Sequence, residues 1–107
     1  MKSHDDAVIE MLCEDPDMAV DYLRTAFDEL DQEGGGSAFL MALRHLVEAR
    51  GGMTAVAERA AVSRESLYRA LSPKGNPTLS TMTAVIKATG IHFHELTGQA
   101  PEVANKR

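Results

Sequence analysis

The sequence lacks most of the residues from which disulfides, metal clusters and membrane anchors are built. It contains one cysteine, Cys13, so neither a disulfide framework nor a thiolate metal cluster is expected. No apolar run approaches the roughly 18 residues that a membrane-spanning helix needs. Acidic residues lie in the first segment, where a signal peptide would be basic. We therefore expect a cytoplasmic protein without a membrane segment, in which Cys13 is a small buried side chain.

Residues arranged for catalysis or for a cofactor are lacking as well. No Ser/His/Asp or paired-carboxylate arrangement can be traced, so we expect no enzyme. His92 and His94 have no Cys or carboxylate at ligand spacing, and such a pair is more typical of a surface than of a metal site. The run 34–36 of three glycines has no preceding strand and no following Lys-Ser/Thr. It predicts a flexible connection between helices, and we expect no cofactor or metal.

A basic excess, which is typical of a nucleic-acid-binding domain, is also missing, since the net charge is −5. The charge is unevenly distributed, however. Residues 1–50 hold 12 acidic and 4 basic side chains, a net charge of −8, whereas residues 51–107 hold 4 acidic and 7 basic, a net charge of +3. Because salt screens charges beyond about 8–10 Å, a local positive region is enough for phosphate binding. The acidic helical half is either a solubilising face or the contact surface of a basic protein.

Apolar residues recur at helical spacing along most of the chain, which predicts an all-α fold in one compact domain. Helices are expected over residues 5–14, 16–32, 38–50, 55–60, 64–71 and 80–89. Polar residues ahead of four of them are the expected N-caps: Asp15, Ser37, Thr54 and Ser63. Gly90 is expected to end the last helix, and residues 91–96 fit either a short strand or a helical turn.

The segment Met53–Leu71 has the pattern of two short helices packed across a tight turn. Small residues stand where the helices cross, and Ala61 occupies the turn position at which a left-handed residue is expected, at a cost of about 1 kcal/mol. The side chains expected to point inward are Val56, Ala57, Ala60, Val62, Leu67, Ala70 and Leu71. The polar side chains of the second helix then point outward, and a helix presented in this way can enter a DNA major groove.

The run MTAVAERAAVSRESLYRAL resembles the helix-turn-helix of phage-repressor-type regulators. The longer string VSRESLYRALSPKGNPTLSTMTAVIKATGI is similar to the addiction-module antidote proteins, which are the antitoxins of type II toxin–antitoxin pairs. The upstream segments DPDMAVDYLRTAF and FLMALRHLVEARGG also resemble that family, so the likeness covers roughly residues 5–91. It implies a dimer that represses its own operon and binds a small RelE/ParE-type toxin. Ala61, where glycine is usual, and Met53, where a polar residue is usual, depart from the pattern.

The resemblance also implies a set of DNA contacts in and after the second helix. Ser63 would cap that helix, Arg64 and Arg69 would meet guanine or phosphate, and Glu65 would accept from cytosine or favour the helix dipole. Ser66 and Tyr68 would reach phosphate or a thymine methyl. The remaining residues would hold the DNA backbone without reading its sequence, and they are Lys74, Asn76 and Thr78.

These observations predict a phage-repressor-like helix-turn-helix bundle with an N-terminal helical extension. The extension would cover residues 1–36, the DNA-binding core 37–98, and a frayed tail 99–107. The expected function is a sequence-specific repressor that is the antitoxin and autorepressor of a toxin–antitoxin operon. Its expected partners are double-stranded DNA with a pseudo-palindromic operator, a second copy of the chain, and a small basic toxin. Two alternatives stay open: a stand-alone regulator without a toxin, and a protein-interaction module that has lost DNA binding.

Overall fold

The computed structural model describes residues 3–97, and every regular element in that range is an α-helix. The helices are α1 (His4–Glu14), α2 (Pro16–Asp28), α3 (Gly35–Ala49), α4 (Gly52–Ala60), α5 (Arg64–Ala70), α6 (Leu79–Ala88) and α7 (Phe93–Thr97). The all-α prediction is therefore confirmed. The ambiguous segment 91–96 leads into α7 and is not a strand. The predicted tail, 99–107, lies outside the described residues. Within residues 3–97, no helix has the length and apolar character needed to cross a membrane.

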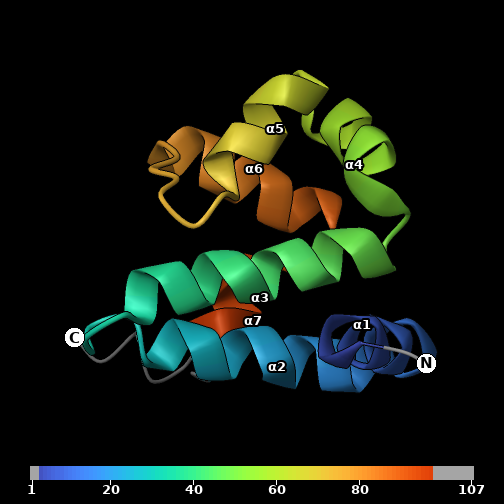
Figure 1. The fold of residues 1–107 in the computed structure, drawn as a ribbon, viewed down its shortest axis with the longest axis vertical. Helices are drawn as coiled ribbons and strands as arrows, with labels where there is room; N and C mark the ends of the chain where they lie inside the picture. The colour runs from blue at the N-terminus through green and yellow to red at the C-terminus, as the bar shows by residue number, and fades with distance from the viewer. Residues whose placement is uncertain (1–2, 98–107) are drawn as a thin grey trace.

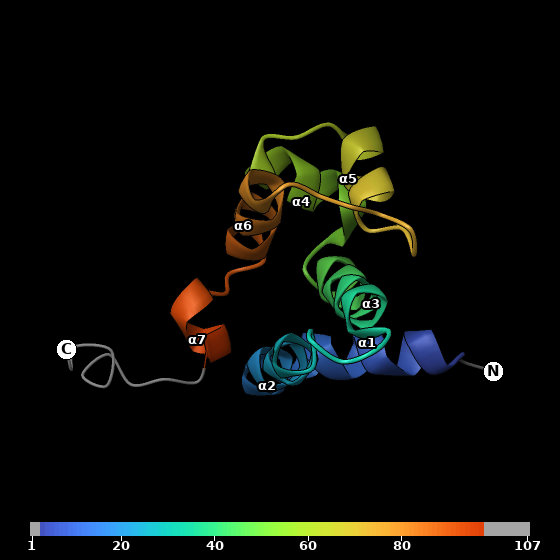
Figure 2. The ribbon, with the colours of Figure 1, turned by 90° about the vertical axis from the view of Figure 1, so that its left-hand side faces the viewer.

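Helix α3 lies at the centre of the molecule. Figures 1 and 2 show α1 and α2 on one side of it and α4, α5 and α6 on the other. Helix α7 packs against α2, so the last described helix returns to the side on which the chain begins. Helices α1 and α2 and helices α4 to α6 thus lie on opposite sides of one central helix.

One hydrophobic cluster runs through both sides of α3. Leu12 of α1, Leu23 of α2, Leu67 of α5 and Leu96 of α7 are all fully buried in it. Five large apolar residues of α3 are also buried in it: Phe39, Leu40, Leu43, Leu46 and Val47. The predicted division of the chain at residue 36 stays a prediction.

A polar chain ties α1, α2 and α3 together beside this cluster. The Tyr22 hydroxyl lies 2.7 Å from Nδ1 of His45, and Nε2 of His45 lies 3.0 Å from a carboxylate oxygen of Asp5. Because a carboxylate only accepts, Nε2 donates to Asp5, and in the neutral imidazole Nδ1 accepts from Tyr22. Burial raises the pKa of Tyr22 above its ordinary value of 10.0, and the nearby charge of Asp5 raises it further.

The start of α2 follows the prediction, but its end does not. Asp15 caps the helix by accepting from the Met18 backbone N–H at 3.1 Å, and Pro16 occupies the first turn. The helix ends at Asp28, four residues before the predicted end at 32, and turns follow as far as Gly34. Leu30 lies in these turns and is 39% exposed.

Two of the predicted N-caps are wrong, and glycine explains both. Helix α3 begins at Gly35 behind the left-handed Gly34 (φ 77°), and α4 begins at Gly52 behind Gly51 (φ 113°). Each left-handed glycine turns the chain into its helix before the hydroxyl residue is reached, so neither Ser37 nor Thr54 is a cap. The segment 34–36 is also more than a flexible connection, because a Cβ on Gly35 would overlap the backbone carbonyl of Glu29.

Cys13 is exposed, so the expectation of a buried cysteine is wrong. Its Sγ lies 3.4 Å from the backbone carbonyl of Ala49, at the end of α3. The neighbouring Leu12 takes the buried position on α1 instead, because adjacent residues of a helix point in different directions.

Candidate nucleic-acid interface

Helices α4 and α5 pack across the turn that the sequence predicted. Ala61 adopts the left-handed conformation (φ 60°, ψ 40°), and the Val62 N–H donates to the Ala57 carbonyl at 3.0 Å. Ala57 and Ala60 are buried at the crossing, and Leu67 fixes α5 in the core. The small side chains allow the two helices to approach closely, and the inward face of α5 is buried in the core.

Ser63 caps α5 as predicted. Its Oγ accepts from the Ser66 backbone N–H at 3.0 Å, and its hydroxyl donates to the Ser66 hydroxyl at 2.8 Å. This pair satisfies one of the backbone donors that the first turn of a helix leaves without a partner.

The outward face of α5 carries the predicted polar side chains, all of them exposed: Arg64, Glu65, Tyr68 and Arg69. The guanidinium of Arg64 lies 5.0 Å from the Tyr68 ring centroid and donates to the Tyr68 hydroxyl at 3.4 Å. A second guanidinium, that of Arg44 on α3, lies 5.6 Å from the same centroid. Both distances fall within the range of a cation–π contact. Arg44 could not be predicted from the sequence, because only the tertiary fold brings this residue of α3 to the Tyr68 ring.

A cleft of about 400 Å³ lies where α5, the loop 72–77 and the start of α6 meet. It brings together five of the residues predicted to contact DNA: Ser66, Arg69, Lys74, Asn76 and Thr78. The other four do not line it, and they are Ser63, Arg64, Glu65 and Tyr68. Thr81 lines the cleft as well and was missed by the sequence analysis. The predicted residues therefore form a polar cleft and a neighbouring exposed helix face.

Local hydrogen bonds hold the loop beside α5. The Ser72 hydroxyl donates to the Arg69 carbonyl at 2.9 Å, and the Gly75 N–H donates to the Ser72 carbonyl at 2.8 Å. Gly75 passes so close to α5 that a Cβ at this position would overlap the Ala70 carbonyl. The Ser37 hydroxyl, which was expected to cap α3, instead donates to the Pro73 carbonyl at 3.3 Å. Residues 72–75 of the loop are thus fixed beside α5 and α3.

The opposite wall of the cleft is the first turn of α6. Thr78 is its N-cap and accepts from the Thr81 backbone N–H at 3.1 Å, while the two hydroxyls lie 3.1 Å apart. Thr78 was predicted to hold the DNA backbone, and in the structure its side chain also caps α6.

The cationic side chains differ in whether the fold uses them. Arg59 donates to the backbone carbonyls of Arg50 and Ala88, at 2.7 and 3.1 Å, and Arg24 donates to the Glu95 carbonyl at 2.9 Å. These guanidiniums hold the fold together. By contrast, the side chains of Arg69 and Lys74 make no hydrogen bond or ion pair with any residue of the range 3–97. Two cations that are unpaired among the described residues, beside several hydroxyls, form a site suited to an anion such as phosphate.

A metal site is not formed by the described residues, since no group of three or more His, Cys, Asp or Glu side chains gathers within 3–97. His92 and His94 stack on one another, with ring centroids 5.7 Å apart.

Comparisons with known proteins give a family and one curated relative. A family model described as "probable addiction module antidote protein" matches residues 4–97. A protein of Haemophilus influenzae, described as uncharacterized, is 42% identical over 66 residues, which cover 62% of this chain and 67% of the relative. No solved structure matches significantly.

Proposed function

The chain belongs to the family of probable addiction module antidote proteins, and on that premise we propose that it is an antitoxin that represses its own operon. An antidote family implies a toxin as partner. The observation that carries the repressor half of the proposal is the cleft between α5 and α6, where Arg69 and Lys74 have no hydrogen-bond or ion-pair partner among residues 3–97. Cations left free in a polar cleft are suited to DNA phosphates.

In the proposed complex, α4 and α5 act as a helix-turn-helix of the phage-repressor type. Helix α5 enters the major groove, which is about 12 Å wide and admits a helix. Arg64 and Arg69 contact guanine or phosphate, and Glu65 and Tyr68 face the base edges from the same exposed side. Lys74, Asn76 and Thr78 hold the phosphate backbone across the cleft.

We further propose that two copies bind together. A homodimer would place two α5 helices about 34–36 Å apart, one turn of the duplex, on a pseudo-palindromic operator. Residues 37–98 would then form the DNA-binding core, and residues 1–36 an extension that is free to meet the toxin.

The repressor proposal is tested on the DNA upstream of the protein's own gene. Arg69→Ala is expected to weaken binding about tenfold or more in fluorescence anisotropy, because a bidentate arginine–guanine contact or a phosphate contact is lost. Lys74→Ala is expected to weaken binding and to lower the slope of log K against log salt by about one phosphate contact. Lys87→Ala is the matched control, because it removes a positive charge on α6 outside this cleft. Unchanged binding in the Arg69 and Lys74 variants would overturn the assignment.

The antitoxin proposal is tested by co-expression with the protein encoded next to this gene. A small basic RelE/ParE-type toxin is the partner we expect, because the half of the chain that precedes α4 is strongly acidic. Expression of that neighbour alone should arrest growth, and co-expression should restore growth and give a stable complex. No complex and no rescue would remove the antitoxin role and favour a stand-alone regulator.

A further inference from the structure

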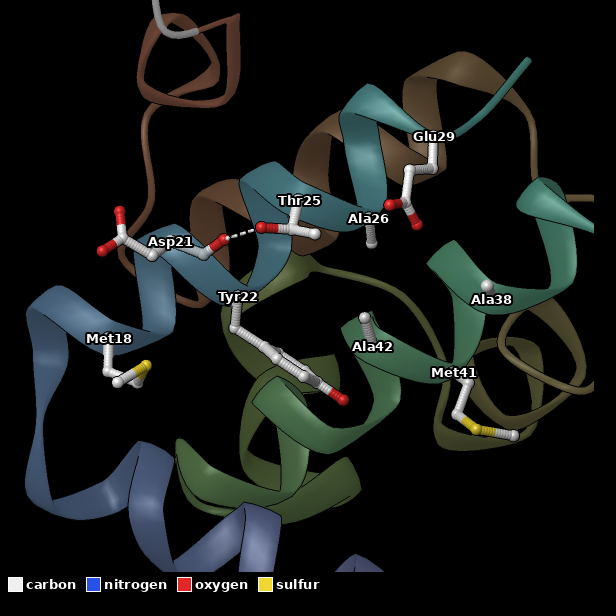
Figure 3. A pocket seen from close by; sticks show the side chains of 9 residues that line it. All are labelled: Met18, Asp21, Tyr22, Thr25, Ala26, Glu29, Ala38, Met41 and Ala42. Carbon is white, nitrogen blue, oxygen red and sulfur yellow. Dashed lines mark hydrogen bonds between the residues drawn. The ribbon is translucent and has the colours of Figure 1, made fainter. Parts of the chain in front are cut away.

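A second hollow, the α2–α3 groove, lies between α2 and α3 and shares no lining residue with the cleft beside α5. It has a volume of about 470 Å³ and is lined by residues of α2 and α3 together with Glu29, the residue just after α2 (Figure 3). Met18 and Met41 are exposed at its edges by 38% and 55%. Large apolar side chains so exposed on the two walls of one groove are typical of a binding surface, and methionine adapts its shape to a partner.

The floor of the groove is largely apolar, and the hydroxyl of the half-buried Tyr22 beside it already has a hydrogen-bond partner. Tyr22 projects between the two helices (Figure 3), and its hydroxyl is hydrogen-bonded to His45 at 2.7 Å. Ala26 and Ala42 face each other beside it, and their small side chains leave the gap between the helices open. A partner that enters this gap buries apolar surface without stranding a hydroxyl.

The rim of the groove is acidic. Asp21 and Glu29 stand at its edge (Figure 3). Asp21 is paired with Arg24 at 2.9 Å, whereas the Glu29 side chain has no ion pair within residues 3–97. Residues 1–50 as a whole carry a net charge of −8. A second copy of the chain placed groove to groove would bring like charges together, which is unfavourable. The complementary occupant is a basic one.

We propose that the α2–α3 groove binds an amphipathic helix of the toxin, with apolar side chains along one face and Lys or Arg beside them. Such a helix lays its apolar face into the groove and places its cations at the Glu29 end of the rim. This inference rests on the proposed antitoxin function and names the surface by which that function is carried out.

The test measures the affinity of the full-length chain for the purified protein of the adjacent gene, by calorimetry. Met41→Lys is expected to weaken binding about tenfold or more, because it places a cation in the apolar contact. Met11→Lys is the matched control, since Met11 is 40% exposed on α1 but does not line the groove. Glu29→Lys is expected to weaken binding more than Glu58→Lys, which makes the same change of net charge on α4. Both methionine variants replace exposed residues, and their thermal unfolding is compared with that of the unchanged chain.

A second measurement needs no substitution in the groove. Methyl-¹³C labelling of methionine gives separate NMR signals, and the signals of Met18 and Met41 should shift when the partner binds, whereas that of Met11 should stay. If the unchanged chain binds the partner but Met41→Lys binds as tightly as Met11→Lys, the groove is not the interface and the antitoxin role stands. If the unchanged chain does not bind, the antitoxin role itself fails. A dimer that Met41→Lys dissociates would make a second copy the occupant and overturn the proposal.

Discussion

The two sides of α3 differ in the chemistry that they leave exposed. On the α5 and α6 side, the cleft is polar, and its Arg69 and Lys74 are unpaired within the part of the chain that the structure describes. On the α2 side, the groove is apolar with carboxylates at its rim. One hydrophobic cluster supports both, so the surfaces differ in their outward side chains and not in the scaffold beneath them. The comparison indicates that a chain of this size can carry two chemically different surfaces on one shared scaffold.

The largest expected effect tests whether the scaffold is truly shared. Leu12→Ala on α1 and Leu67→Ala on α5 each empty a fully buried position, and each should lower the free energy of unfolding by about 2–5 kcal/mol. Because both leucines belong to one cluster, each variant should unfold in a single transition that far-ultraviolet circular dichroism and hydrogen exchange report alike. A Leu12→Ala variant that loses protection only before residue 36 would show two independent units and contradict the shared scaffold.

A matched pair of glycines tests the turn that positions the groove. Gly35→Ala should cost roughly 1–3 kcal/mol, because the new methyl group meets the Glu29 carbonyl and the backbone must shift. Gly36→Ala should be neutral or slightly stabilising, since a Cβ there meets nothing within 4 Å. Chemical denaturation of both variants measures the difference. Equal stabilities would mean that the segment 34–36 is only a connection.

The same steric argument applies on the DNA side. Gly75→Ala should displace the loop from α5, because its methyl group would overlap the Ala70 carbonyl. The variant is expected to lose affinity for the promoter while its affinity for the partner protein stays within about twofold, as additivity between distant sites implies. A loss of both affinities would mean that the two surfaces are coupled.

The N-caps of α2 and α5 should contribute equally to stability but unequally to promoter binding. Asp15→Ala and Ser63→Ala each remove one cap hydrogen bond and should each cost about 1 kcal/mol. Only Ser63→Ala should weaken promoter binding, because Ser63 is the N-cap of α5, the helix proposed to enter the DNA major groove. Anisotropy titrations of the two variants at the same temperature measure their affinities for the promoter. Equal affinities would contradict the proposed contact between α5 and DNA.

The last prediction concerns Tyr22 of α2 and the pH dependence of the free energy of unfolding. The pKa of Tyr22 is raised in the folded chain, so the folded state holds this proton more tightly than the unfolded state. The stability that follows is fully present below pH 10.0 and is lost as the pH rises through the raised pKa. Tyr22→Phe should therefore be less stable at neutral pH, by about 1 kcal/mol for the lost hydrogen bond, and the gap should narrow above pH 10. Denaturation at pH 7 and pH 11 measures it, and a constant gap would contradict the shift.

The helices could be predicted from the sequence because their apolar spacing is regular, and the buried faces of α3 and α5 follow from it. The caps at Ser37 and Thr54 could not, because the left-handed glycines that precede them start the helices earlier. The resemblance supplied Lys74 and Asn76 as candidates, but the cleft that joins them to Arg69 depends on tertiary packing. Arg44, Thr81 and the α2–α3 groove have the same origin. Periodicity predicts which side chains of a helix face the core. It does not predict where packed helices leave a groove open to solvent.

The central claim is that the two surfaces serve two partners at once, and one titration tests it most directly. Labelled promoter DNA is saturated with the chain, and the purified protein of the adjacent gene is then added while anisotropy is followed. We predict a further rise of the anisotropy to the value of a complex that holds all three components, and no such rise with Met41→Lys. A fall of the anisotropy to the value of free DNA would show that the two partners compete for one surface, and it would contradict the account.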